Sequence, residues 1–169
     1  MRKFMALLLC AVLAFGAAGC KGGGDADPSS SQATVLPEGT HPVEESVEEL
    51  GTVTVLRQYI ESQGTDNTVP DEGNVFLLCE FRIENTTDED MHISTTLCFT
   101  GYADGVEVAP SIKALEARGA HSTLDSSMKA CQTMLGVVGF EVPADWKVFQ
   151  VDFQPDAMRS DAISFAFAK

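Results

Sequence analysis

The cysteines are the residues of this 169-residue chain whose positions are most informative about chemistry. Cys20 directly follows three small residues at positions 17–19, an apolar run over residues 4–15 and two basic residues at positions 2 and 3. A basic start, a short apolar core and small residues before a cleavage point are the pattern of an export signal. We therefore expect cleavage before Cys20, which would place its thiol at the start of the mature chain.

Residues 17–20 resemble the lipobox of bacterial lipoproteins, in which the new N-terminal cysteine carries a diacylglycerol. Ala17 stands where that motif most often has Leu, and a plain secretory signal with an incidental Cys20 is the alternative. A spanning helix is disfavoured because the apolar run is shorter than the ~20 residues a bilayer requires. The resemblance implies a signal peptide over residues 1–19, lipidation of Cys20, and a location on the extracellular face of the cell membrane.

The chain is strongly acidic, with 25 Asp and Glu against 11 Lys and Arg and a formal net charge of −14 at pH 7. A field of this sign repels nucleic acid and anionic lipid head groups. We expect no nucleic-acid partner. Attachment to the membrane would then depend on the lipid on Cys20 rather than on the protein surface.

Residues 21–49 contain little clustered apolar sequence. Glycines occupy positions 22–24, serines occupy positions 29–31, and four Glu lie between positions 44 and 49. Such a composition buries too little apolar surface to offset the entropy of ordering. The sequence therefore predicts a lipidated cysteine and flexible tether over residues 20–49, followed by one domain over residues 50–169.

Apolar and polar residues alternate along most of that domain. In residues 74–85, the side chains from Leu77 to Ile83 place Cys79 and Phe81 on one face and Glu80 on the other. This period of two is typical of a half-buried strand. The predicted strands are 52–60, 74–85, 91–102, 106–109, 133–142, 146–154 and 162–168, with a helical turn over 113–118 and a short strand at 122–124. About seven or eight short strands predict an all-β fold, an antiparallel β-sandwich.

Three stretches carry a resemblance to a known family: DEGNVFLLCEFRIENTTDEDMHIS, YADGVEV, and MLGVVGFEVPADWKVFQVDFQP followed by AISFAF. They resemble the immunoglobulin-like domain of unknown function of Gram-positive bacterial lipoproteins, akin to a small secreted mycobacterial immunogenic protein. The resemblance covers residues 50–168 and implies an immunoglobulin-like sandwich at the cell surface. It brings no catalytic residues, and Cys131 stands where relatives tend to have Gly.

Three cysteines lie in the domain, and an odd number leaves at least one thiol free or paired between chains. Cys79 shares the inward face of its strand, so we expect a buried hydrophobic side chain. Cys98 falls on the face opposite Leu97 and Phe99. If a disulfide forms, Cys98 and Cys131 are the candidate pair, which requires their Cα atoms to lie within about 7 Å of each other.

Metal and catalytic motifs are weak throughout. Soft ligands such as His92, Cys98 and Cys131 occur without a Cys-x-x-Cys or a histidine pair, so nothing preorganises a metal site. The acidic turn at 88–90 lacks the spacing of a calcium loop. No nucleophile elbow or glycine-rich phosphate cradle is present. We therefore expect no enzyme, cofactor or metal.

These observations predict a membrane-anchored extracellular lipoprotein with a non-catalytic binding or accessory β-sandwich domain. The ligand would be a protein, glycan or peptide. The alternative is a metal-handling or redox-sensing envelope lipoprotein that uses His92, Cys98 and Cys131.

Overall fold

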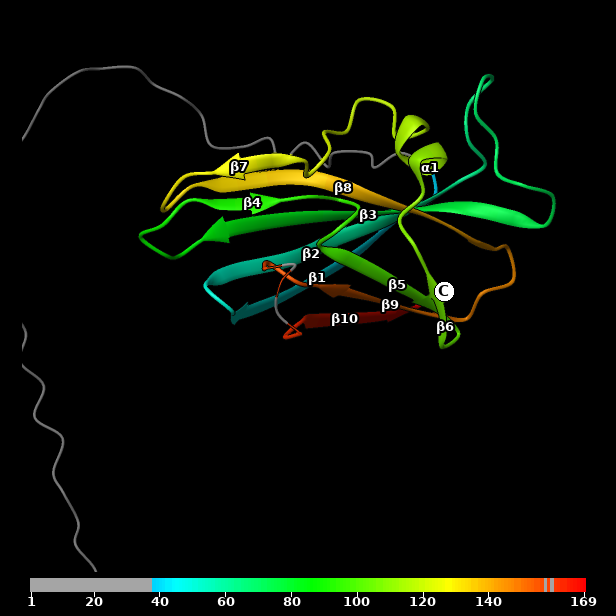
Figure 1. Ribbon diagram of the computed structural model, residues 1–169. Helices are drawn as coiled ribbons and strands as arrows, with labels where there is room; N and C mark the ends of the chain where they lie inside the picture. Colours follow the sequence, from blue (N-terminus) through cyan, green and yellow to red (C-terminus); the bar gives the residue numbers. More distant parts are fainter. Residues whose placement is uncertain (1–37, 157, 159) are drawn as a thin grey trace, which may run out of the picture. The chain divides into compact units, whose positions relative to one another are not determined.

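The computed structural model of the protein describes residues 38–156, 158 and 160–169, all within the compact unit Val35–Lys169. Their strands form two four-stranded antiparallel sheets and a third sheet of two strands (Figure 1). The first sheet has the order β1 (Thr40–Glu49), β2 (Thr52–Ser62), β3 (Asn74–Asn85), β8 (Thr133–Pro143). The second has the order β10 (Ile163–Ala168), β9 (Val148–Phe153), β5 (Phe99–Ala103), β6 (Val106–Val108). The third pairs β4 (Met91–Ile93) with β7 (Ser126–Met128), and the short helix α1 spans Ile112–Glu116.

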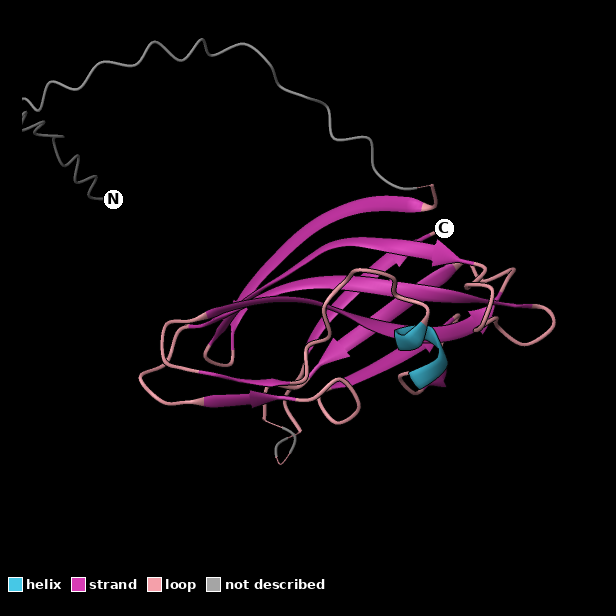
Figure 2. Ribbon diagram, turned by 90° about the horizontal axis from the view of Figure 1, so that it is seen from above, coloured by secondary structure: helices cyan, strands magenta, loops and turns pink. Residues whose placement is uncertain are grey.

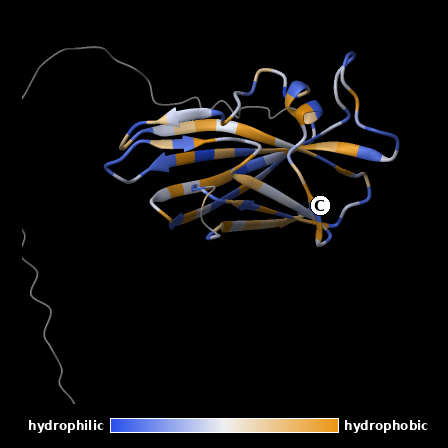
Figure 3. Cartoon of the chain, viewed as in Figure 1, coloured by the Kyte–Doolittle hydropathy of each residue, from blue (hydrophilic) through white to orange (hydrophobic). Residues whose placement is uncertain are grey.

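The hydrophobic core lies between the two larger sheets and is rich in aromatic side chains. The ring of Phe81 in β3 lies 5.3 Å from that of Phe99 in β5 and 5.5 Å from that of Phe165 in β10, measured between centroids. Apolar and polar residues alternate along the strands (Figure 3), so each sheet turns one apolar face inward. The predicted antiparallel β-sandwich is confirmed, with ten strands in the described residues rather than seven or eight.

Several predicted elements agree closely with the structure. β3 covers Asn74–Asn85 as predicted, and Asp104 and Gly105 form the tight turn of the β5–β6 hairpin with φ values of 49° and 82°. The helical turn is α1, which begins after its N-cap Ser111. The chain turns at Gly119, with φ 65°, soon after the helix ends.

The predicted strand over residues 91–102 is wrong as a single element. It is divided into β4 and β5, which belong to different sheets, by a turn in which the Cys98 amide donates to the Ser94 carbonyl at 2.9 Å. The Asp125 carboxylate holds this turn by accepting from the Thr95 amide at 2.8 Å and the Thr95 hydroxyl at 2.6 Å. The turn leaves Leu97 68% exposed, so the predicted inward side chain faces solvent.

The predicted boundary at residue 50 is also wrong. Residues 40–49, assigned by sequence to the tether, form β1, which pairs with β2 over residues 40–42 and 45–49 (Figure 2). Val43 and Val47 pack against the core from this strand. The acidic composition of β1 reflects its place at the sheet edge, where most of its side chains are exposed.

The outer face of β3 is covered rather than solvated. Ala114 of α1 lies over Phe76 and Leu78 in a second apolar cluster, and a Cβ at Gly139 would lie 2.8 Å from the Ala114 Cβ. Glu80, predicted to face solvent, is only 6% exposed. The carboxylate of Glu80 accepts from Arg57 at 2.8 Å, and one of its oxygens lies 3.2 Å from His121 Nδ1.

The predicted short strand at 122–124 corresponds to an isolated parallel bridge between Thr123 and Val137. β7, which begins at Ser126, was not predicted. Among the described residues no helix is long and apolar enough to cross a membrane.

Candidate functional site

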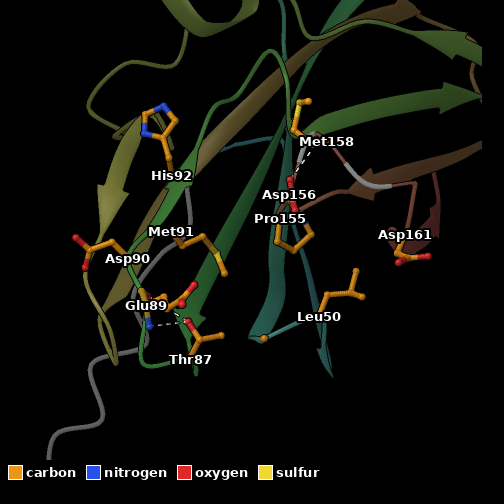
Figure 4. Close-up of a pocket in the computed structure, with 11 residues that line it drawn as sticks. Leu50, Thr87, Glu89, Asp90, Met91, His92, Pro155, Asp156, Met158 and Asp161 are labelled. Carbon is orange, nitrogen blue, oxygen red and sulfur yellow. Dashed lines mark hydrogen bonds between the residues drawn. The ribbon is translucent and has the colours of Figure 1, made fainter.

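A groove of about 600 Å³ lies where three chain connections meet at one end of the sandwich (Figure 4). We call it the end groove. It is lined by Leu50 and Gly51 of the β1–β2 turn, by Thr87, Glu89, Asp90, Met91 and His92 around the β3–β4 connection, and by Pro155, Asp156, Met158 and Asp161 of the β9–β10 connection. The lining therefore comes from segments far apart in sequence and from both sheets.

The β1–β2 turn has a backbone conformation that suits Gly51 but is uncommon for Leu50. Leu50 and Gly51 have φ values of 52° and 75°, the left-handed combination of a tight hairpin. The Gly51 carbonyl accepts from the Thr86 amide at 3.0 Å, which links this turn to the β3–β4 connection. A Cβ at Gly51 would lie 2.6 Å from Thr87 Cγ2, so a larger residue would push the two walls of the groove apart.

Asn85 positions the β3–β4 connection from within the protein. Its side chain is fully buried, and Nδ2 donates to the carbonyls of Glu89 at 2.8 Å and Lys129 at 3.2 Å. Its Oδ1 accepts from the Thr87 amide at 3.0 Å and the Thr87 hydroxyl at 2.8 Å. This Asn-Thr-Thr step is part of the sequence that carries the family resemblance, and its role is to fix one wall of the end groove.

The groove combines apolar and acidic side chains. Figure 4 shows Leu50, Met91 and Pro155 between the carboxylates of Asp90 on one side and Asp161 on the other. Asp90 pairs with Lys129 Nζ at 2.6 Å. The hydrogen bond to Asp90 and the charge of its carboxylate raise the pKa of Lys129.

Two carboxylates of the groove have no cationic partner among the described residues. These are Glu89 and Asp161, both exposed, and the only described cation paired in the groove is the Lys129 that meets Asp90. An apolar surface beside unpaired carboxylates is suited to a ligand that has a positive charge next to an apolar group.

The predicted site residues are not brought together. Cys20 and the signal peptide over residues 1–19 lie outside the described residues, so lipidation stays a prediction. The candidate disulfide is not formed in this structure, in which Cys98 and Cys131 are free thiols. The antiparallel pairing of Met91 with Met128 and of Ile93 with Ser126 places Cys98 beyond one end of the β4–β7 ladder and Cys131 beyond the other.

The environments of the three thiols differ. Cys79 is fully buried, as predicted, and burial raises its pKa far above the usual value. Cys98 was predicted on the face opposite Phe99 but is buried too, because the turn at 94–98 changes the strand parity, and burial also raises its pKa. Cys131 is exposed and has a φ of 58°, a backbone conformation that favours Gly.

The alternative metal site has no geometric support. No group of three or more His, Cys, Asp or Glu residues suited to a metal ion occurs in the part of the chain that the structure describes. His92 lines the end groove, but its Nδ1 lies 3.2 Å from Ser127 Oγ, and Figure 4 shows its ring turned away from the other labelled side chains. Cys98 and Cys131 lie beyond opposite ends of the β4–β7 ladder, so they do not form a common metal site with His92.

The end groove itself was missed from the sequence. The acidic turn at 88–90 was considered only as a calcium loop, and neither Leu50 nor Asp161 gives any local signal of a site. Its one available clue was that acidic residues recur in connections at 88–90, 156 and 161. Which connections share one end of a sandwich depends on strand order, which the sequence did not reveal.

The strand arrangement places the described residues among antiparallel β-sandwich domains. Residues 41–163 match the family described as "Domain of unknown function (DUF4352)", and the chain belongs to it. The match begins inside β1, which agrees with the corrected domain boundary. No curated protein matches the sequence.

Three of the solved structures with a similar fold come from Bacillus species. A "putative lipoprotein (ycdA)" from Bacillus subtilis aligns with a TM-score of 0.61 and 11% identity over 75% of this chain and 39% of that one. The yjhA protein of Bacillus subtilis aligns with a TM-score of 0.57 and 14% identity over 75% and 97% of the two chains. A conserved hypothetical protein from Bacillus anthracis aligns with a TM-score of 0.52 and 14% identity over 66% of this chain and 88% of that one. The chain thus spans well under half of the first of these proteins, and these likenesses concern the fold.

Proposed function

We propose that this protein is a membrane-anchored extracellular lipoprotein whose β-sandwich is a non-catalytic binding module. The end groove would bind ligands that combine a positive charge with an apolar group. The observation that carries this proposal is that Glu89 and Asp161, which have no cationic partner among the described residues, lie beside the apolar side chains of Leu50 and Met91.

The anchor is supported by the sequence before Cys20 and by the likeness in fold to a Bacillus subtilis protein described as a putative lipoprotein. A diacylglycerol supplies two acyl chains, which hold a protein stably where one chain gives only marginal binding. The acidic domain would be repelled by anionic lipids, so it would project from the membrane with its groove accessible to solvent.

The anchor is tested by phase partition in a detergent that separates on warming. The wild-type chain, expressed in a Gram-positive bacterium, should enter the detergent phase. Cys20→Ala should remain uncleaved and lose acyl attachment, which labelling with a radioactive fatty acid would show. Equal acyl labelling of the variant would refute the lipid anchor on Cys20.

The ligand is tested with the short peptide acetyl-Lys-Leu-Lys-amide and the full chain in detergent. The groove variant combines Glu89→Gln and Asp161→Asn in one chain. The control variant combines Glu72→Gln and Asp145→Asn. The control removes the same charge from exposed positions outside the groove. Two exposed ion pairs contribute about 0.4–2 kcal/mol together, so the groove variant should bind about two- to thirty-fold more weakly.

The control should bind within about twofold of wild type. Equal weakening of both variants would mean that the net charge of the chain, not the groove, attracts the peptide. No weakening of either variant would exclude the groove as the site.

A further inference from the structure

The outer edge of β1 is open in the described part of the protein. β1 is ten residues long and stands at the end of its sheet, paired on one side with β2 (Figure 2). Alternate residues of an edge strand point their N–H and C=O groups outward, where a further strand can pair with them. This edge therefore has backbone hydrogen-bonding capacity that the described strands do not use.

The regular part of the edge is short and leads to the end groove. The register between β1 and β2 shifts between Pro42 and Glu45, where Glu44 has a φ of 55°, so the strand bulges there. From Glu45 to Glu49 the pairing is continuous, a length of about 16 Å. The chain then enters the β1–β2 turn at Leu50, which lines the end groove.

The charge of β1 restricts what can pair with it. The strand contains four Glu, at positions 44, 45, 48 and 49, and no Lys or Arg, and all four are exposed. Two copies of β1 side by side would set these carboxylates against one another, which is destabilising. A strand with Lys or Arg side chains would place cations opposite them.

The carboxylates are present on both faces of the strand. Glu45 and Glu49 share the face of Val47, which packs against the core, while Glu48 is on the other face. A partner strand with basic residues on both faces would be favoured over one with basic residues on a single face. The carboxylates of the end groove continue this charge beyond the strand.

We infer that the β1 edge binds an extended basic polypeptide segment as an additional strand, with one end of that segment in the end groove. This inference rests on the proposed function, since it identifies the ligand class of the same site. Backbone hydrogen bonds to Glu45–Glu49 would supply affinity, and the carboxylates would select for Lys and Arg.

The test uses the full chain in detergent and the peptide Lys-Thr-Lys-Lys-Val-Lys-Thr-Lys with a fluorescent label. Two further peptides of the same sequence have N-methyl groups on alternate backbone amides. One is methylated at the odd-numbered positions and the other at the even-numbered positions. Methylation keeps the charge but removes the donors needed for pairing. We expect at least tenfold weaker binding of one methylated peptide, together with slower hydrogen exchange of β1 amides when the unmodified peptide binds.

A charge variant adds a matched comparison. Glu44, Glu45, Glu48 and Glu49 are all replaced by Gln, and the control replaces the exposed Asp66, Glu72, Glu107 and Asp145 by their amides. The β1 variant should bind the unmodified peptide at least tenfold more weakly, and the control should stay within threefold. Equal binding of both methylated peptides and the unmodified peptide, or unchanged exchange in β1, would overturn the inference.

The two proposals can fail separately. Binding of acetyl-Lys-Leu-Lys-amide in the end groove without protection of β1 by the longer peptide would retain the proposed function and refute strand addition. Protection of β1 by the longer peptide without any binding of the short peptide in the groove would retain strand addition and refute the proposed function. Self-association of the chain that protects β1 would refute a basic partner, because the occupant would be a second copy.

Discussion

Replacing Asn85 by Ala removes the side chain that holds the β3–β4 wall of the end groove. Four hydrogen bonds are lost, two donated by Nδ2 to the Glu89 and Lys129 carbonyls and two accepted by Oδ1 from Thr87. Each such bond contributes about 0.5–1.5 kcal/mol, and the partly exposed Thr87 can recover some bonding with water. We expect the free energy of unfolding to fall by about 2–4 kcal/mol.

Urea unfolding followed by Trp fluorescence measures this loss. Trp146 is the single tryptophan of the chain and is fully buried, so its emission reports unfolding of the core. With an m-value of about 2 kcal/mol/M, the midpoint should fall by about 1–2 M while m stays unchanged. Asn67→Ala is the matched control, because Asn67 is exposed and should change stability by less than about 0.5 kcal/mol.

Asn85→Asp tests whether the loss of stability comes from the missing Nδ2 donor or from the missing side-chain volume. It keeps the side-chain size and an oxygen that can accept both hydrogen bonds from Thr87. It also directs a carboxylate oxygen at the Glu89 and Lys129 carbonyls, so it should destabilise at least as much as Ala at pH 7. If Asn85→Ala and Asn67→Ala give the same midpoint, the network does not stabilise the fold and the reasoning about this wall of the groove is wrong.

Three further predictions concern the core, the thiols and β1. Phe81→Ala should cost about 3–5 kcal/mol in urea unfolding, because its fully buried ring contacts aromatic rings from the opposite sheet, whereas exposed Lys147→Ala should cost less than about 0.5 kcal/mol. A soluble protein starting at Lys21 should show one rapidly reactive thiol toward Ellman's reagent, that of Cys131, and three after denaturation; fast reaction of all three without denaturant would contradict the burial of the other two. Starting the protein at Leu50 instead removes β1 and should lower the melting temperature by more than about 10 °C in calorimetry. A change of only a few degrees would mean that residues 40–49 belong to the tether, as the sequence predicted.

The parts of the fold that the sequence predicted well are those whose signal is local. β3 was predicted to the residue because its inward side chains alternate without interruption up to Ile83 and a turn follows Asn85. The Asp104-Gly105 hairpin was predicted because a positive φ at both positions restricts which residues can occupy them. In both cases the determining interactions lie within the segment itself.

The errors arise where a distant residue decides the structure. Alternation continues from residue 91 to 102, yet the Asp125 carboxylate, 30 residues from Thr95, stabilises a turn in the middle. β1 has a weak pattern because Val43 and Val47 are its only core-facing apolar residues and a bulge interrupts its register. Its strand structure depends on β2, so composition alone suggested a tether.

Backbone groups determine the shape of this wall of the end groove, whereas side chains determine its charge. Asn85 Nδ2 bonds the backbone carbonyls of Glu89 and Lys129, so the clamp itself does not depend on the side chains at those two positions. The carboxylate of Glu89 instead projects from a loop whose backbone is already fixed. A change of side chain there can alter the charge of the groove while the loop keeps its conformation. Glu89→Gln should therefore unfold within about 0.5 kcal/mol of wild type and still weaken binding of a cationic peptide, whereas Asn85→Ala should impair both stability and binding.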